Sequence, residues 1–321
     1  MRLWSVLVLL LVLAACRDTG SAGPQPTPSP TPAIGKEAAA AAVQSYVKSI
    51  NQANGDLDPE LSAKIETGSA REIHAAQYKV YKRNDLHYPV VEYDAGVAAA
   101  PRFIGYPRWF FAAATDKGSS PATRDLLVFV QQSKGAPWRV TYAPYSQTTT
   151  GPLAPGVDVD DAPRLVAWGD KGLVVPPNRL AASLAGLLTS GSARQLFAPG
   201  RLITTSLSEN RQAFGQNGWT GTSRAVPAPT PVYASRTKSG GALVWFALDL
   251  RHSYKAGPSA AQMTWQTAYG DLHRGFGVPS AVRSKIERVE RTEVIAYVPP
   301  RGKGRIQLIG SRWFPLSVTG Y

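Results

Sequence analysis

The sequence predicts an α+β protein in which two lobes follow one another, each made of helices leading into a curved antiparallel sheet. A helical pattern begins at residue 36, runs of aromatic and β-branched residues with a period of two follow it, and the same order returns after a turn-rich stretch. An apolar fraction of 44% is sufficient for a sizeable core. We therefore expect an N-terminal domain over residues 36–150, a linker over 151–162 and a C-terminal domain over 163–321.

Residues 1–15 have the pattern of an export signal. Arg2 precedes an apolar run from Leu3 to Ala15, and small residues end that run before Cys16. As a helix, these thirteen residues would rise about 20 Å, which is short of the roughly 30 Å of a bilayer's hydrocarbon core. The run is therefore expected to be a signal rather than a membrane span.

The four residues Leu13-Ala14-Ala15-Cys16 resemble the lipobox of bacterial lipoproteins. The resemblance implies that residues 1–15 are a signal peptide, that Cys16 is lipidated and becomes the first residue, and that the lipid holds the protein on the outer face of the cell membrane. The alternative is an ordinary secretory signal in which the cysteine is incidental. Because Cys16 is the only cysteine and its thiol is expected to carry the lipid, we expect no intrachain disulfide, no thiol nucleophile and no zinc–thiolate site.

Residues 16–35 are expected to be the lipidated cysteine and a proline-rich tether. Prolines occupy every second position from Pro24 to Pro32, which favours extended polyproline II and prevents a helix. At about 3.1 Å per residue, such a segment reaches up to roughly 60 Å. The tether could therefore hold the body away from the membrane.

Two helices are predicted at the start of the first domain. Residues 36–53 combine an alanine run with an apolar stripe at positions i, i+3, i+4 and i+7, and an Asn-Gly pair ends the helix. The second helix begins after Asp58 as its N-cap, with Pro59 in the first helical position, and runs to about Glu66. The period then changes to two, which predicts strands over residues 77–82, 108–115, 125–132 and 138–143.

The second domain repeats this order of elements. Helices are predicted over residues 177–188, where leucines form a stripe, and over 208–214. A long insertion near residues 255–290 separates two strands of the second sheet, and long insertions in compact domains are often functional. The predicted strands cover residues 230–237, 242–252, 291–298, 305–309 and 313–319.

Helices that lead into an antiparallel sheet rich in Trp, Phe and Tyr resemble the nuclear transport factor 2-like fold, so both lobes are expected to be cone-like. The resemblance implies a concave face in each lobe that binds a small ligand or is filled by side chains. The residues expected to line this cavity in the second lobe are Tyr233, Trp245, Asp249 and His252.

The first domain also resembles a family of exported lipoproteins from high-GC Gram-positive bacteria. That family has no established activity, so the resemblance supports an extracytoplasmic, lipid-anchored location and little else. The residues that carry the resemblance are Asn51, Asn54, Leu57, Asp58, Leu61, Glu66 and Gly68.

Positive charge is concentrated in the second half of the chain. Residues 17–150 hold 14 Lys and Arg against 12 Asp and Glu, whereas residues 151–321 hold 20 against 10. A basic surface outside the membrane favours anionic lipid headgroups or anionic cell-wall polymers, and nucleic acid is not expected there. The alternative is a merely solvated surface. The expected contacts to an anionic partner are Arg274, Arg283, Lys285, Arg288 and Arg291.

The sequence contains none of the common catalytic motifs. The histidines lack the spacing of a helical metal pair, and there is no Gly-x-Ser-x-Gly elbow, P-loop or dinucleotide fingerprint. The acidic cluster of Asp158, Asp160 and Asp161 lacks the Gly and the distal Glu of a calcium loop, so a solvated turn is expected. We expect no catalytic residue, no metal and no cofactor.

These observations favour a non-enzymatic binding or scaffold module of the cell envelope. Its expected partners are the membrane, through the lipid, and an anionic wall polymer, a lipid headgroup or an envelope protein. One alternative is a small-ligand-binding protein or a hydrolase- or isomerase-like enzyme in a cavity of the second domain, with Asp249 or His252 as acid or base. Another is a protein–protein interaction module of an envelope complex.

Overall fold

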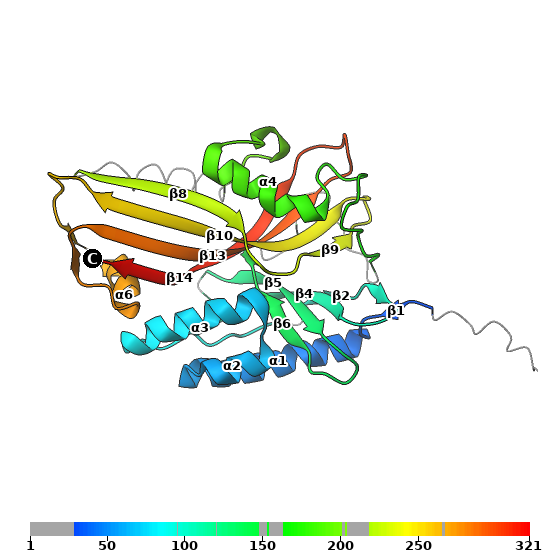
Figure 1. Ribbon diagram of the computed structural model, residues 1–321. Helices are drawn as coiled ribbons and strands as arrows, with labels where there is room; N and C mark the ends of the chain where they lie inside the picture. Colours follow the sequence, from blue (N-terminus) through cyan, green and yellow to red (C-terminus); the bar gives the residue numbers. More distant parts are fainter. Residues whose placement is uncertain are drawn as a thin grey trace, which may run out of the picture.

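The computed structural model describes residues 29–94, 96–119, 121–147, 153, 163–200, 203, 218–264 and 267–321. The expected signal peptide over residues 1–15, Cys16 and most of the tether lie outside these ranges. So do the expected helix over 208–214 and the linker over 151–162, apart from residue 153. Within the described ranges the protein is α+β, with helices covering a large antiparallel sheet (Figure 1). The α+β class expected from the sequence is therefore confirmed.

Two helices begin where the sequence predicts them. Helix α1 spans Lys36–Asp56 and helix α2 spans Pro59–Ile65. The Asp58 carboxylate caps α2, because it accepts hydrogen bonds from the backbone N–H groups of Glu60 (2.8 Å) and Leu61 (3.1 Å). None of the helices in the described ranges is both long enough and apolar enough to cross a membrane.

The expected strand over residues 77–82 is wrong. These residues belong to helix α3, which spans Gly68–Arg83. Its buried residues include Ala70, Ile73 and Tyr78, which are spaced as one face of a helix. A window of a few residues is too short to distinguish a period of 3.6 from a period of two, and its tyrosines and valine favoured a strand.

The described strands form one ten-stranded antiparallel sheet and two two-stranded sheets. The large sheet has the order β2-β4-β5-β7-β14-β13-β10-β8, with β6 also beside β5 and β9 beside β10. Its strands are β2 (Val97–Ala99), β4 (Arg108–Asp116), β5 (Thr123–Gln131), β6 (Arg139–Tyr142), β7 (Tyr145–Ser146), β8 (Trp219–Pro227), β9 (Tyr233–Arg236), β10 (Ala242–Ala256), β13 (Lys285–Val298) and β14 (Gln307–Gly320). The small sheets pair β1 (Thr31–Pro32) with β3 (Arg102–Phe103) and β11 (Met263–Thr264) with β12 (Ala281–Val282).

The second half departs from the sequence prediction in two places. The strands expected over residues 305–309 and 313–319 are parts of the single strand β14, which pairs with β13 through two register shifts. Strand β8 was not predicted, because its sequence is mostly polar and gives no clear alternation. The expected insertion near 255–290 corresponds to the connection between β10 and β13, which holds β11, helix α6 (Thr267–Gly275) and β12.

The two halves of the chain share one sheet. The short strand β7 pairs with β5 of the first half and, through Tyr145 and Ser311, with β14 of the second half. The sheet folds back on itself, so that one face of β4 and β5 packs against one face of β10 and β13. Figure 1 shows the resulting layers: helix α4 (Pro177–Ser190), the second half-sheet, the first half-sheet, and helices α1 to α3.

Aromatic rings fill the space between the two half-sheets. The ring of Trp245 lies 4.9 Å from the ring of Phe111 and 6.3 Å from that of Trp109. Trp245 also donates a hydrogen bond from Nε1 to the carbonyl oxygen of Leu126 (3.1 Å). The ring of Trp109 in turn lies 5.4 Å from that of Tyr233. These contacts join segments that are far apart in the sequence.

We predict that Trp245→Ala lowers the free energy of unfolding by about 3–5 kcal/mol, because it removes a buried indole and leaves the Leu126 carbonyl without its donor. Urea unfolding followed by circular dichroism measures this change. The control is Trp168→Ala, which removes a side chain that is 59% exposed and should change stability by less than about 0.5 kcal/mol. Two separate unfolding transitions in the unaltered protein would contradict a core shared between the halves.

Candidate functional site

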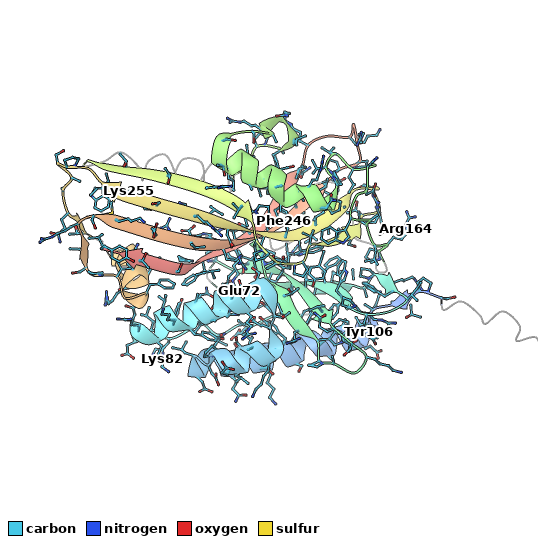
Figure 2. The ribbon with its side chains drawn as sticks, viewed as in Figure 1. Glu72, Lys82, Tyr106, Arg164, Phe246 and Lys255 are labelled. Atoms are coloured by element: carbon cyan, nitrogen blue, oxygen red, sulfur yellow. The ribbon has the colours of Figure 1, made fainter. Side chains whose placement is uncertain are left out.

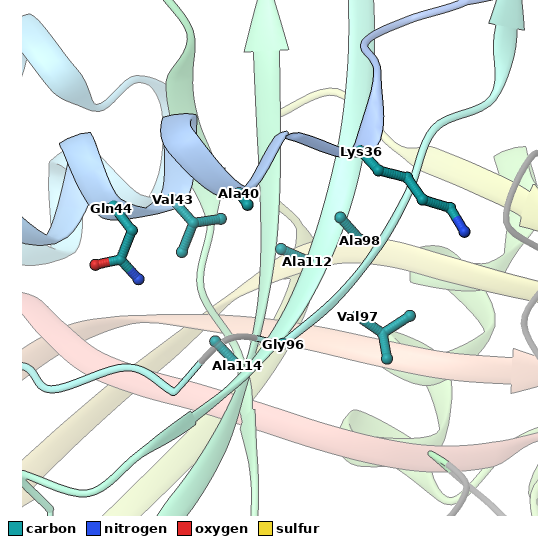
Figure 3. A pocket seen from close by; sticks show the side chains of 9 residues that line it. All are labelled: Lys36, Ala40, Val43, Gln44, Gly96, Val97, Ala98, Ala112 and Ala114. Carbon is teal, nitrogen blue, oxygen red and sulfur yellow. The ribbon is translucent and has the colours of Figure 1, made fainter. Parts of the chain in front are cut away.

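A pocket of about 390 Å³ lies between the first turns of α1 and strands β2 and β4 (Figure 3). One face of β4 explains the hollow. Phe110, Ala112 and Ala114 share that face, and the Phe110 ring stacks on Phe129 at 4.7 Å, whereas the two alanine methyl groups leave space unfilled. The lining residues are Lys36, Ala40, Val43, Gln44, Gly96, Val97, Ala98, Ala112 and Ala114.

The polar groups of this pocket are few. Lys36 and Gln44 are exposed residues of α1. Behind the pocket, Asp125 pairs directly with Ala114 in the sheet and accepts hydrogen bonds from the hydroxyl groups of Tyr93 (2.5 Å) and Thr123 (3.1 Å). Burial raises the pKa of the Asp125 carboxyl to about 6. The pocket is therefore an apolar hollow with an ammonium group among its lining residues.

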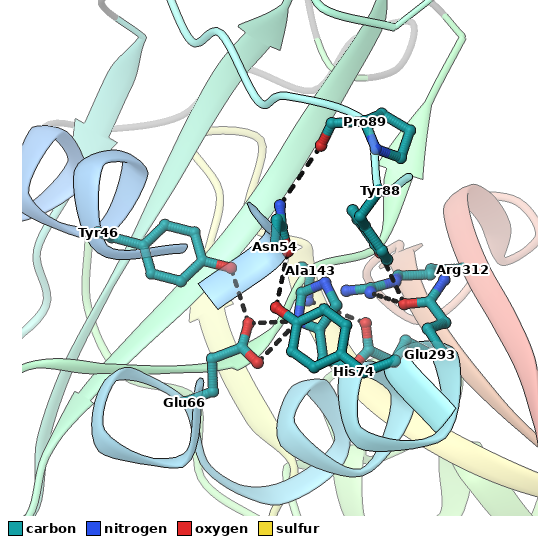
Figure 4. Close-up of polar contacts among 11 residues, drawn as sticks. Tyr46, Asn54, Glu66, His74, Tyr88, Pro89, Ala143, Glu293 and Arg312 are labelled. Atoms are coloured by element: carbon teal, nitrogen blue, oxygen red, sulfur yellow. Dashed lines mark hydrogen bonds and ion pairs between the residues drawn. The ribbon is translucent and has the colours of Figure 1, made fainter. Parts of the chain in front are cut away.

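A cluster of buried polar side chains lies between the three N-terminal helices (Figure 4). Glu66, which follows α2, is 0% exposed and accepts a hydrogen bond from the hydroxyl group of Tyr46 (2.7 Å). Nδ1 of His74 lies 2.7 Å from each Glu66 carboxylate oxygen. Burial lowers the pKa of His74, which favours a neutral ring whose Nδ1–H donates to Glu66.

Strands β13 and β14 extend this cluster with a second carboxylate and a guanidinium group. Glu293 and Arg312 are direct partners in the sheet. Arg312 donates to the side-chain oxygen of Gln77 on α3 (2.8 Å), and Glu293 accepts from the backbone N–H of Ala143 (2.9 Å). Burial raises the pKa of Glu293 to about 7, although the charge of Arg312 opposes this shift. The cluster therefore connects the helices to the second half-sheet.

The pair of Glu66 and His74 has the chemistry of an acid–base site but not the access. His74 is only 6% exposed, and the pocket beside α1 includes neither residue. Their hydrogen bonds instead fix α2 and α3 relative to α1. Sequence reasoning did not find this pair, because it missed α3. The helical spacing of residues 68–83 is the signal that could have placed His74 opposite Glu66.

The residues expected to line a cavity in the second half do not line one together. Tyr233 and Trp245 are directly paired and lie in the aromatic core between the half-sheets. Asp249 accepts a hydrogen bond from Nε of Arg291 (2.6 Å). His252, whose Nε2 lies 3.5 Å from Oε2 of Glu290, is on the opposite face of β10 from Trp245 and Asp249, because strand residues alternate.

The basic residues expected to contact an anionic partner are mostly paired with acids. Arg291 is 3% exposed, so its guanidinium group cannot reach an external polymer. Arg283 is exposed. Cys16, the expected lipidation site, lies outside the described residues. The internal ion pairs are Arg274–Asp271 and Lys285–Glu287 (both 2.5 Å), Arg288–Glu290 (2.6 Å), Arg291–Asp249 (2.6 Å) and Arg291–Glu72 (2.5 Å).

In the described part of the chain, no three His, Cys, Asp or Glu side chains come together as a metal site would require. The family described as "Domain of unknown function (DUF8094)" matches residues 30–314, a range that includes strands of both half-sheets. No curated protein and no solved structure gives a significant match.

We predict that Glu293→Gln makes the free energy of unfolding less dependent on pH between about pH 4 and about pH 8. The pKa of Glu293 is raised from 4.5 to about 7 in the folded state, so its stabilising effect is full below pH 4.5 and is lost as the pH rises through 7. The unaltered protein should therefore lose on the order of 3 kcal/mol relative to Glu293→Gln between about pH 4 and about pH 8. Urea unfolding of both proteins across this range measures the difference. A difference that does not change with pH would contradict the raised pKa.

Proposed function

The chain belongs to the family described as a domain of unknown function (DUF8094), and for this member we propose a non-enzymatic, lipid-anchored binding or scaffold module at the outer face of the cell membrane. The observation that carries the proposal is the sequence Leu13-Ala14-Ala15-Cys16, which a proline-rich segment connects to the folded body. The body begins at β1, which pairs with β3. Residues 16–30 are thus available as a tether.

Binding rather than catalysis is supported by the way the ionisable groups are used. The carboxylate of Glu66 is bound to Tyr46 and His74, and that of Asp249 is bound to Arg291. These groups are buried and satisfied by one another, whereas a general acid or base must reach a substrate. Asp249 is held by Arg291, and His252 is only 4% exposed, so the geometry gives the enzyme alternative with Asp249 or His252 no support.

The similarity to the nuclear transport factor 2-like fold remains part of the proposal for each half. In the first half, α1 to α3 cover one face of the strands and leave a hollow beside α1. In the second half, α4 covers one face of β10 and β13. Helices before a sheet in both halves support two cone-like units, which here share their strands in one sheet.

We predict that Cys16→Ala abolishes the incorporation of radiolabelled palmitate and moves the protein out of the salt-washed membrane fraction, because the thiol is the only possible thioether site. The matched control is Ser21→Ala in the same segment, which should change neither result. If the unaltered protein takes up no palmitate, or if Cys16→Ala leaves salt-resistant membrane association intact, the anchor is refuted.

A second candidate function is the binding of a small apolar ligand, and the pocket beside α1 favours it. Its volume of about 390 Å³ is within the range of ligand sites, and its lining is mostly Ala and Val. The ammonium group of Lys36 suits a ligand with an anionic end. The pocket belongs to the first half, whereas the cavity-lining residues named from the sequence belong to the second half.

We predict that Ala40→Leu weakens the binding of anilinonaphthalene sulfonate about tenfold, because the larger side chain fills the pocket without entering the core. Fluorescence titration of the folded protein measures this affinity. The matched control is Ala41→Leu, an exposed position of α1 outside the lining, and it should leave the affinity unchanged. Equal affinities for both variants would contradict a ligand site here.

A further inference from the structure

One end of the molecule is the place where the tether joins the body; we call it the tether end. Strand β1 pairs there with β3, and Arg102 donates a hydrogen bond to the carbonyl oxygen of Pro30 (3.4 Å). The loop after β3 exposes Ile104 (62%) and Tyr106 (39%), and the guanidinium group of Arg108 lies 4.9 Å from the Tyr106 ring. Apolar and basic side chains thus surround the point where the tether begins.

The second half contributes to the same end. The ring of Trp109 lies 6.3 Å from the ring of Phe103 and 5.4 Å from the ring of Tyr233, so the aromatic core connects the two halves near this end. Strand β9 begins at Tyr233. The segment of Arg164 and Leu165 lies beside β9, because Leu165 forms an isolated β-bridge with Ser235. Figure 2 shows Arg164 and Tyr106 at one end of the molecule and Lys82 and Lys255 at the other.

Three basic residues project from the turn between β13 and β14 at this end. Arg301, Lys303 and Arg305 are exposed, and none of them forms an ion pair with a described residue. Positive φ angles at the intervening glycines form the tip of the turn. The backbone N–H of Arg301 donates to the carbonyl oxygen of Gly172 (2.7 Å), and the same connection before α4 carries the exposed Trp168.

The opposite end is basic as well, because Arg251, Lys255 and Arg283 are exposed there and none of them forms an ion pair with a described residue. The basic residues of α6 and of the start of β13 are largely neutralised by neighbouring acids. Bilayer surfaces take Trp and Tyr at the depth of the headgroups and attract Lys and Arg when the lipids are anionic. Among the described residues, what distinguishes the tether end is the start of the tether beside the exposed side chains of Ile104 and Tyr106.

We infer that the tether end docks on an anionic phospholipid surface, so that the body lies on the membrane to which Cys16 attaches it. This inference rests on the proposed lipid anchor. It assigns the contact to the turn of residues 301–305, to residues 104–106 and to Trp168, in place of the basic run over residues 274–291. The tether then keeps the body close to the membrane, while the turn of residues 301–305 and the loop of residues 104–106 fix the orientation of the body on it.

The test uses the lipidated full chain in vesicles that contain brominated phosphatidylcholine, with or without phosphatidylglycerol. Gly105→Cys introduces a label site at the tether end, where an added side chain meets no atom within 4 Å, and Ser280→Cys introduces one at the opposite end. Cys16 carries lipid, so a thiol-reactive fluorophore labels only the introduced cysteine. Quenching by the brominated lipid reports which end lies on the membrane.

We expect strong quenching at residue 105 and little at residue 280 in anionic vesicles, and a smaller contrast at high salt or without phosphatidylglycerol. Removing three charges with Arg301→Gln, Lys303→Gln and Arg305→Gln should weaken docking roughly a hundredfold, at about 1 kcal/mol for each charge. The matched control removes three exposed charges from the other end, Arg251→Gln, Lys255→Gln and Arg283→Gln, and should keep the contrast.

Equal quenching at both label sites, or an unchanged contrast after the triple substitution at the turn, would overturn the inference. A wall polymer would be the partner instead if two results came together. The protein would bind isolated cell wall and lose that binding after the triple substitution, and on vesicles residues 105 and 280 would be quenched equally. Failure of the anchor looks different: the chain would not float with neutral vesicles, yet would still float with anionic vesicles at low salt if the tether end docks.

Discussion

Trp245 lies where the two halves of the chain meet, and the rest of the architecture depends on its burial. Its ring contacts Trp109 and Phe111 of the other half-sheet, and such pairs contribute about 0.5–1.5 kcal/mol beyond the burial of area. The hydrogen bond from its indole to Leu126 fixes how the two half-sheets lie on each other. With these inner faces occupied, the outer faces are left for α1 to α3 on one side and α4 on the other.

Polar contacts complete this junction on the side of α3. Arg291 reaches Glu72 of α3, and Arg312 reaches Gln77 on the same helix. Buried charges of this kind cost desolvation energy and contribute more to position than to stability. Arg291 and Arg312 therefore hold α3 on the second half-sheet, and the hydrogen bonds of Glu66 hold α2 and α3 against α1. This structural use of buried ionisable groups is the physical reason for proposing a binding module.

Local patterns explain what could be predicted from the sequence. Asp58 with Pro59 is a helix start that depends on adjacent residues alone, and the aromatic run around Phe110 is visible within β4. The joining of the halves could not be predicted, because it depends on a two-residue strand, β7, whose partners lie far away in the sequence. Likewise, Arg291 and Arg301 are both basic in the sequence, and only the fold shows that the first is buried and the second exposed.

A body with one shared core presents its surface residues in one fixed arrangement, and this links the fold to the proposed membrane contact. Native-state hydrogen exchange tests the shared core most directly. If the halves form one unit, the slowest amides of β5 and of β13 should exchange with the same opening free energy, within about 1 kcal/mol, and respond equally to added urea. A markedly lower opening free energy for one of these strands, with the other still protected, would contradict the account.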